Sequence, residues 1–245
     1  MRQLLNLLDK NRAAPREIRA EASDAGVSLY LNGVIDADWG IGLADLVAAL
    51  PADPAPVSMY INSPGGDVFE ARAMAGAIAR HPGPVTAIIE GVAASAATYL
   101  AMAAGSVQMG DGSLLMVHNS WTLSMGDKND LLETAALLEK IDGTIAADYA
   151  RKTGATPEQV TAWMDAETWF TAQEAADAGF VDSIVPNTQG TRAQWDLSAY
   201  SNAPKPEQIP EQTVEERVAL QVQRVTNRLR LLGTGVSAPP HRTAA

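Results

Sequence analysis

The sequence contains no cysteine among its 245 residues, and this absence excludes several kinds of chemistry. A disulfide scaffold, a zinc site built on thiolates and a cysteine nucleophile all require that residue. The composition fits a reducing compartment, so we expect a cytoplasmic protein. We also expect neither a metal site nor any other cofactor.

The sequence has few positive charges and no long apolar run. Its 18 Lys and Arg against 29 Asp and Glu give a net charge of -11, which argues against nucleic acid as a partner. The most apolar stretch, residues 85–104, is interrupted by Glu90 and by small residues, and the N-terminal apolar stretch is too short for a secretory signal. We therefore expect no membrane association.

Aromatic residues are scarce, at 5%, but hydrophobic residues make up 47% of the chain, which is typical of a globular protein. Three regions differ in composition: a polar N-terminal segment at 1–26, a domain at 27–186 that is large enough to form a hydrophobic core, and a tail at 187–245. The negative charge is concentrated before residue 187, which supports a boundary there.

The tail has two predicted parts. Residues 187–210 are polar and proline-rich, as in a linker, and residues 213–232 combine a capping box with an apolar seam, which predicts a helix. That helix is either a solvated surface helix or a helix that docks onto a partner. In both cases we expect the tail to be separable from catalysis.

Between residues 27 and 186, predicted strands alternate with predicted helices. The strands are expected at 27–35, 57–62, 85–90, 106–109, 114–118 and 181–185. The helices are expected at 41–50, 68–80, 94–104, 127–152, 157–165 and 172–178. This order predicts an α/β fold with largely parallel strands, whose active site lies at the carboxyl ends of the strands.

Three features follow strands and together suggest a serine hydrolase. Ser95 comes after the strand at 85–90, near a helix N-terminus, and His118 ends the strand at 114–118. The Gly65-Gly66 turn follows the strand at 57–62. Of the three histidines in the chain, only His118 is placed by ordered structure, and its neutral imidazole, with an ordinary pKa of about 6.5, suits a general base.

The motifs around these residues resemble the proteolytic subunit of the Clp protease. The matching segments are Ser63-Pro64-Gly65-Gly66, Ala93-Ala94-Ser95, Met116-Val117-His118 and Gly179-Phe180-Val181-Asp182-Ser183-Ile184, in the family's order over about 27–186. Residues 167–175 look like the phage and prophage branch, the head maturation proteases.

This resemblance implies a ClpP/crotonase-type spiral fold with a protruding handle helix at 126–152, through which rings stack. It implies Ser95 as nucleophile, His118 as base, and oxyanion donors at the Gly66 and Ala96 amides. Counting back from Gly179, the family's aspartate falls on Glu167, which is one methylene longer, and Asp165 is the near alternative.

The expected function is a serine endopeptidase with a Ser-His-acid triad, which self-associates into rings and processes capsid or scaffold proteins in phage head maturation. It would act in the bacterial host cytoplasm or within a phage prohead, and a Clp-type ATPase stays open as a partner. Two alternatives remain: an assembly scaffold with a decayed triad, and a crotonase-type acyl-CoA enzyme on the same fold.

Overall fold

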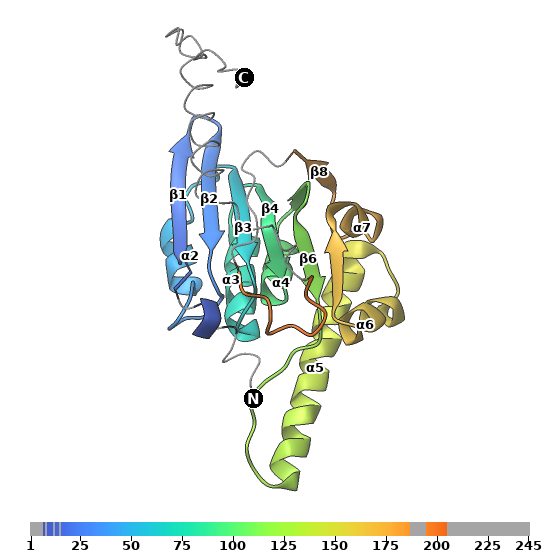
Figure 1. Ribbon diagram of the computed structural model, residues 1–245. Helices are drawn as coiled ribbons and strands as arrows, with labels where there is room; N and C mark the ends of the chain where they lie inside the picture. The colour runs from blue at the N-terminus through green and yellow to red at the C-terminus, as the bar shows by residue number, and fades with distance from the viewer. Residues whose placement is uncertain (1–6, 8, 12, 15, 187–194, 205–245) are drawn as a thin grey trace, which may run out of the picture. The chain divides into compact units, whose positions relative to one another are not determined.

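The computed structural model describes residues 16–186 and 195–204, together with residues 7, 9–11 and 13–14 (Figure 1). The predicted tail helix at 213–232 and most of the predicted linker lie outside the described residues. No helix within the described ranges is long and apolar enough to cross a membrane.

The described residues form one eight-stranded sheet. Six strands follow the order β1-β2-β3-β4-β5-β8, while β6 pairs with β4 and β7 pairs with β6. The strands are β1 (Glu17–Ser23), β2 (Gly26–Asn32), β3 (Val57–Ser63), β4 (Val85–Ala94), β5 (Ser106–Gly110), β6 (Leu114–Val117), β7 (Thr168–Thr171) and β8 (Ser183–Val185). All pairs are parallel except β1–β2 and β6–β7. The predicted α/β class is confirmed.

The described helices, which are 6 to 26 residues long, connect many of these strands. They are α2 (Leu43–Ala49), α3 (Val68–Arg80), α4 (Ala96–Ala101), α5 (Lys128–Thr153), α6 (Pro157–Asp165) and α7 (Ala172–Asp177). Figure 1 shows α2, α3 and α4 on one face of the sheet. The predicted helix at 68–80 is confirmed with the same bounds, because the Asp67 side chain caps it by accepting from the Glu70 amide.

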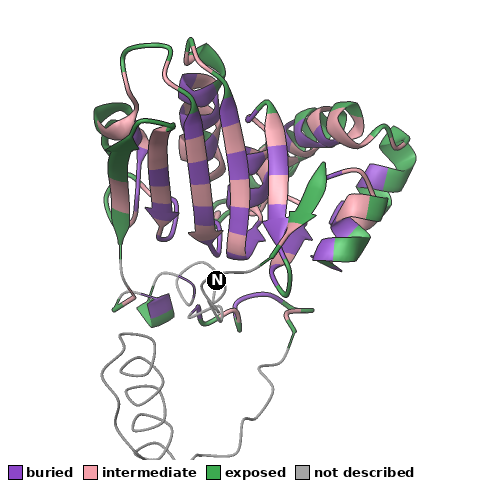
Figure 2. Ribbon diagram, turned by 90° about the horizontal axis from the view of Figure 1, so that it is seen from above, coloured by how far each residue is buried: buried purple, intermediate pink, exposed green. Residues whose placement is uncertain are grey.

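The sheet buries alternate residues. Along β3 every second side chain is buried, and Val57, Met59 and Ile61 join Ala71 and Met74 of α3 in the main core. Figure 2 shows the same alternation along the central strands. A period of two is expected where helices cover one face and the other face is less completely covered.

β4 is longer than the sequence predicts, and this positions the site. Thr86–Ile89 pairs with β5, and Val92–Ala94 then pairs with β6. The strand therefore changes partner part-way along its length. As a result the residue after β4, Ser95, lies beside the end of β6.

Two strands were not predicted. β1 is almost wholly exposed at the edge of the sheet, and its Arg19 guanidinium lies 4.3 Å from the centre of the Tyr30 ring. β7 is a four-residue antiparallel strand between α6 and α7. β7 lacks the alternation of apolar and polar residues on which a strand prediction depends. β1 does alternate, but its apolar positions are one isoleucine and two alanines, which is a weak signal.

Helix α5 projects beyond the sheet at its N-terminal end (Figure 1). Asp127 caps this end by accepting from the Asn129 and Asp130 amides, and Gly154, with φ 73°, ends the helix in the left-handed region. The C-terminal half packs on the core through Ile141, Ile145 and Tyr149. Three leucines of the N-terminal half are exposed, namely Leu131, Leu132 and Leu137, whereas Leu138 is partly buried.

Candidate active site

Ser95 occupies a sharp turn between β4 and α4. Its backbone, with φ 56° and ψ -119°, is in a region that non-glycine residues rarely adopt. The turn is held by the Ser95 amide, which donates to the Met116 carbonyl at 2.9 Å, and by the Thr98 hydroxyl, which is 2.7 Å from the carbonyls of both Ala93 and Met116. Such strain costs about 1–3 kcal/mol and is typical of functional sites.

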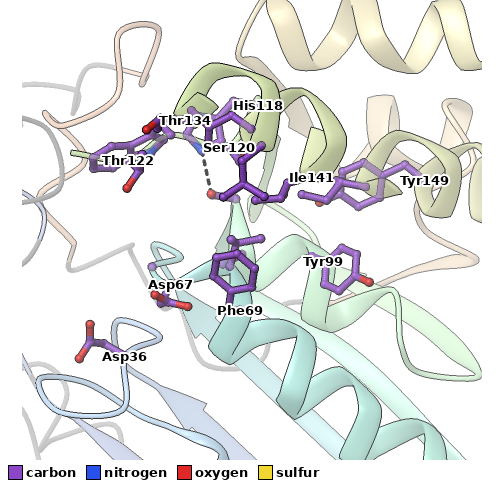
Figure 3. Close-up of a pocket in the computed structure, with 18 residues that line it drawn as sticks. Asp36, Asp67, Phe69, Tyr99, His118, Ser120, Thr122, Thr134, Ile141 and Tyr149 are labelled. Carbon is purple, nitrogen blue, oxygen red and sulfur yellow. Dashed lines mark hydrogen bonds between the residues drawn. The ribbon is translucent and has the colours of Figure 1, made fainter. Parts of the chain in front are cut away.

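His118 follows β6 and reaches the same point. Its Nε2 atom lies 2.7 Å from the Ser95 Oγ atom (Figure 3). The two residues meet because the ends of β4 and β6 are neighbours in the sheet. The structure thus brings together the serine and histidine that the sequence singled out.

The imidazole of His118 is neutral at pH 7. Burial of the ring is the larger effect and lowers the pKa of His118 to about 4, although the negative charges of Glu167 and Asp142 act in the opposite direction. A neutral imidazole can accept the proton of the Ser95 hydroxyl, as a general base must. The expected pKa near 6.5 is therefore corrected downward by the buried position.

The Gly65-Gly66 turn lies against the end of β4. Both residues have positive φ, at 92° and 150°. A Cβ on Gly65 would stand 2.5 Å from the Ala94 carbonyl oxygen, and one on Gly66 would stand 2.0 Å from the Ile35 carbonyl oxygen. Only glycine fits this close approach of backbone to backbone.

Two backbone amides border the pocket beside Ser95. Gly66 forms a β-bridge with Ile35, in which the Ile35 amide donates to the Gly65 carbonyl and the Asp67 amide donates to the Ile35 carbonyl. The Gly66 amide itself takes no part in this bridge. Ala96 is the first residue of α4, where an amide has no partner within its helix. Both residues line the pocket that contains Ser95 and His118. Their role as oxyanion donors stays a prediction.

Glu167 is half-buried between α6 and β7. Its carboxylate accepts from the Asn202 amide at 2.6 Å, from the Ser201 amide at 3.0 Å and from Trp169 Nε1 at 3.4 Å. Its charge raises the pKa of His118, but the described residues include no hydrogen bond between the two. Within the described chain, Glu167 and Ser95 are the two non-glycine residues with positive φ.

Two other carboxylates lie nearby. Asp165 is exposed and accepts from the Asn119 side-chain amide at 2.7 Å. Asp142, on α5, accepts from the Ser120 amide at 2.6 Å and, like Glu167, raises the pKa of His118. The sequence analysis missed Asp142, because a carboxylate within a long helix carries no signal of its tertiary neighbours.

The pocket next to Ser95 has an apolar wall and an acidic end. The wall comes mainly from α5, with Leu137, Leu138, Ile141 and Ile145. Figure 3 shows Asp36 and Asp67 together at one end of the pocket and Tyr99 and Tyr149 at the other. Within the described ranges, no group of three or more histidine and acidic side chains is arranged to hold a metal ion.

Residues 195–204 also reach the site, which the sequence analysis did not anticipate. Trp195, Ala199 and Tyr200 are buried, with Met116 and Ala94 among their neighbours. The Tyr200 ring meets the His118 ring edge-on, with centres 5.3 Å apart. The sequence predicts a linker here. A polar, proline-containing stretch gives no sign that it packs against residues more than 75 positions earlier in the chain.

Comparison with known proteins places this geometry in a family. The family model described as Clp protease matches residues 38–188, which span the turn at Gly66, Ser95, His118 and Glu167. The chain belongs to the Clp protease family. It is accordingly a serine-type peptidase, and its α/β sheet with helices is consistent with a ClpP-like fold.

Several Clp protease subunits are similar to the chain. The ATP-dependent Clp protease proteolytic subunit 2 of Rhodococcus jostii (strain RHA1) is 33% identical over 161 residues, which cover 64% of this chain and 83% of that protein. Subunit 3 of the same organism is 33% identical over 174 residues, covering 69% of this chain and 86% of the relative. Subunit 3 of Streptomyces coelicolor is 31% identical over 152 residues, or 61% of this chain and 70% of the relative.

Proposed function

We propose that the chain is a serine endopeptidase in which Ser95 is the nucleophile, His118 the general base and Glu167 the acid of the triad. One observation carries the proposal: the Ser95 hydroxyl, in a strained turn, lies 2.7 Å from Nε2 of a neutral imidazole. A serine hydroxyl is a poor nucleophile until such a base takes its proton.

The reaction follows from these positions. Ser95 Oγ attacks the carbonyl carbon of the peptide bond while its proton passes to His118 Nε2. The negative charge that forms on the substrate oxygen is stabilised by the amides of Gly66 and Ala96. His118 then gives its proton to the leaving amine, and a water molecule, deprotonated by the same imidazole, hydrolyses the acyl-enzyme.

Glu167 supports the imidazolium that forms transiently on His118. Its negative charge already raises the pKa of that ring, which is the electrostatic effect required of the third triad member. Asp165 is a weaker candidate, because it is exposed and bonded to Asn119. Asp142 also raises the pKa of His118, but its effect is smaller than that of Glu167.

Self-association into rings is supported by exposed apolar side chains on and before α5. Leu132 is 59% exposed and Met125 is 82% exposed, and these residues lie close to Leu123, Leu131 and Leu137 in the chain. A concentration of exposed apolar residues marks an interaction surface. The named relatives are ATP-dependent subunits, which supports a Clp-type ATPase as a partner.

The biological setting that we propose is phage head maturation, with capsid or scaffold proteins as substrates in the host cytoplasm or the prohead. It rests on the resemblance of residues 167–175 to the head maturation branch. Structural proteins of a capsid are protein substrates of the class that a serine endopeptidase cleaves. The apolar wall of the pocket fits the side chains of such a polypeptide.

Labelling with a fluorophosphonate tests the catalytic proposal. We expect the full chain to be labelled at Ser95 and to hydrolyse a peptide, while Ser95→Ala does neither and folds as the parent does. A decayed scaffold or a crotonase-type enzyme would leave Ser95 unlabelled. That result would overturn the proposal.

A further inference from the structure

Residues Trp195–Ala203, which we call the C-terminal strap, cross the edge of the sheet at which the parallel strands end. Figure 1 shows this segment in orange, next to the end of β6. Its buried residues pack against Val34, Val92, Ala94 and Met116, which follow or end strands of the sheet. The strap therefore lies at the same edge as the catalytic serine and histidine.

The first part of the strap is fixed to the body of the domain. Trp195 is buried, and its Nε1 atom donates to the Asn62 side chain at 2.8 Å. The Asp196 amide donates to the Asn11 side-chain oxygen at 2.8 Å, and the Asn11 side-chain nitrogen donates back to the Asp196 carbonyl at 3.0 Å. These bonds set the register of the residues that follow.

Tyr200 contacts two parts of the catalytic site. Its hydroxyl donates to the Pro64 carbonyl in the turn that leads to Gly66, and its ring packs edge-on against His118. Burial raises the pKa of Tyr200 above its usual range, so the hydroxyl stays protonated and can donate. The side chain thus connects the glycine turn with the base.

The next two residues contact the third part of the site. The amides of Ser201 and Asn202 both donate to the Glu167 carboxylate, at 3.0 Å and 2.6 Å, and the Asn202 side chain donates to the Ala166 carbonyl at 2.8 Å. No lysine or arginine of the described chain forms an ion pair with Glu167. The two backbone amides are therefore the main groups that orient this carboxylate.

We propose that the strap is a positioning element of the protease: Tyr200 holds His118 and the Pro64 carbonyl, while the Ser201 and Asn202 amides hold Glu167. This inference rests on the proposed triad. It adds that residues of the predicted tail are needed for full turnover, although none of them lines the pocket beside Ser95.

The alternative, that the strap covers and inhibits the site, is disfavoured by the position of the pocket. The pocket is lined by residues from the Gly66 turn, α4, α5 and the loop after His118, and no strap residue is among them. The Tyr200 hydroxyl also lies beside Ser95, whose side chain acts to lower the pKa of that hydroxyl. The strap still leaves open the pocket next to Ser95, since it does not line that pocket.

A pH profile distinguishes positioning from mere stability. The charged groups that act on His118 are the carboxylates of Glu167 and Asp142, and burial opposes them to give a pKa of about 4. The strap contributes the neutral Tyr200 ring to that burial. Loss of the ring should admit water and move the pKa of His118 up toward its ordinary value of about 6.5.

The first experiment compares Tyr200→Ala with Tyr200→Phe in the full chain, with a fluorogenic peptide as the probe. Since a misplacement of about 1 Å can cost 10²-fold, we expect Tyr200→Ala to lower kcat by about that factor, with KM little changed. Its acid limb of kcat/KM should move up by at least one pH unit. Tyr200→Phe keeps the ring, so its acid limb should stay with that of the parent and its kcat should fall less.

The second experiment removes a single amide donor, so that the test does not depend on Tyr200 alone. Ser201→Pro deletes the N–H that bonds Glu167, and Ser201→Ala keeps it. We expect Ser201→Pro to have a kcat about tenfold or more below that of Ser201→Ala, because hydrogen bonds to a charged group contribute about 1.5–3 kcal/mol. Thermal unfolding of both variants checks that the fold is retained.

The outcomes separate this inference from the proposed function. Failure of the parent chain to react at Ser95 would overturn the proposed triad, and this inference with it. If the parent is active and Tyr200→Ala and Ser201→Pro keep its kcat and acid limb, the positioning role alone is wrong. A rise in kcat on loss of Tyr200 would show an inhibitory strap and would equally overturn the proposal.

Discussion

Two substitutions of Ser95 separate the effect of its hydroxyl on activity from the effect of its backbone conformation on stability. Both Ser95→Ala and Ser95→Gly remove the hydroxyl, and we expect both to abolish hydrolysis. With φ at 56°, however, alanine keeps the backbone strain and glycine relieves it. Ser95→Gly should therefore be more stable than Ser95→Ala by about 1 kcal/mol, as measured by denaturant unfolding. Equal stabilities would contradict the strain assigned to this turn.

The proposed role of His118 as general base predicts the pH dependence of activity. Only the neutral imidazole accepts the Ser95 proton, and burial lowers the pKa of His118 to about 4. We expect kcat/KM for a short peptide to rise with pH through about 4 and to be level between about pH 6 and pH 8. An acid limb centred near 6.5 in the intact protein would show that the ring is hydrated.

The same residue contributes to acid unfolding. The pKa of His118 is lower in the folded state than in the unfolded chain, so the unfolded state binds more protons between about pH 4 and pH 6.5. Stability should rise with pH across this window, by an amount on the order of 3 kcal/mol from this group. His118→Asn, which does not titrate there, should flatten the slope in urea unfolding measured across the window.

Glu167 and Asp165 can be compared directly by isosteric substitution. Glu167→Gln removes the charge that acts on His118, whereas Asp165→Asn alters an exposed contact with Asn119. We expect Glu167→Gln to lower kcat far more than Asp165→Asn, by up to about 10⁴-fold. A larger loss from Asp165→Asn would reassign the third member of the triad.

The sequence predicts the positions of some site residues but not the contacts of others. The proximity of Ser95, His118 and the Gly66 turn was predictable, because each follows a strand and parallel strands end at one edge of a sheet. The contacts of Asp142 and Tyr200 were not, since they depend on how α5 and the strap pack. Tertiary contacts of this kind have no local signature in the sequence.

At the scale of elements, substitutions in α5 test whether the chain assembles into rings. Its exposed Leu132 is expected to be covered in a ring, so Leu132→Glu would place a charge in an apolar interface. We expect Leu132→Glu to sediment as a smaller species than the parent. Lys140→Glu, at another exposed position of the same helix, serves as the control and should sediment with the parent. Identical sedimentation of all three would exclude this surface from the interface.

Elements with local signals were predicted best. The capped helix at 68–80 has the predicted bounds, and α5 agrees to within one residue at each end. Strand β1 was missed because its apolar positions are mostly alanine, which is a weak strand signal, and β4 was predicted too short because Gly91 to Ala94 is rich in small residues. Gly91, with φ 95°, lies where β4 passes from β5 to β6.

At the scale of the whole molecule, two truncations locate the end of the catalytic unit. The described residues up to Pro204 belong to one compact unit, and this unit includes the strap. We expect a chain that ends after Pro204 to hydrolyse a short peptide at nearly the rate of the full chain. A chain that ends after Pro186 lacks Tyr200, Ser201 and Asn202 and should lose most of its kcat. The sequence alone predicts the opposite result, because it indicates a tail from residue 187 that is separable from catalysis. Equal rates for the two truncations would restore that earlier boundary.

The position of the strap in the sequence has a consequence for biosynthesis. Ser95, His118 and Glu167 are translated before the strap, and the strap also pairs with Asn11, one of the first described residues of the chain. A nascent chain can therefore fold its sheet without completing its catalytic machinery. Full proteolytic competence would arise only after the strap has left the ribosome, which delays cleavage of neighbouring proteins until that point.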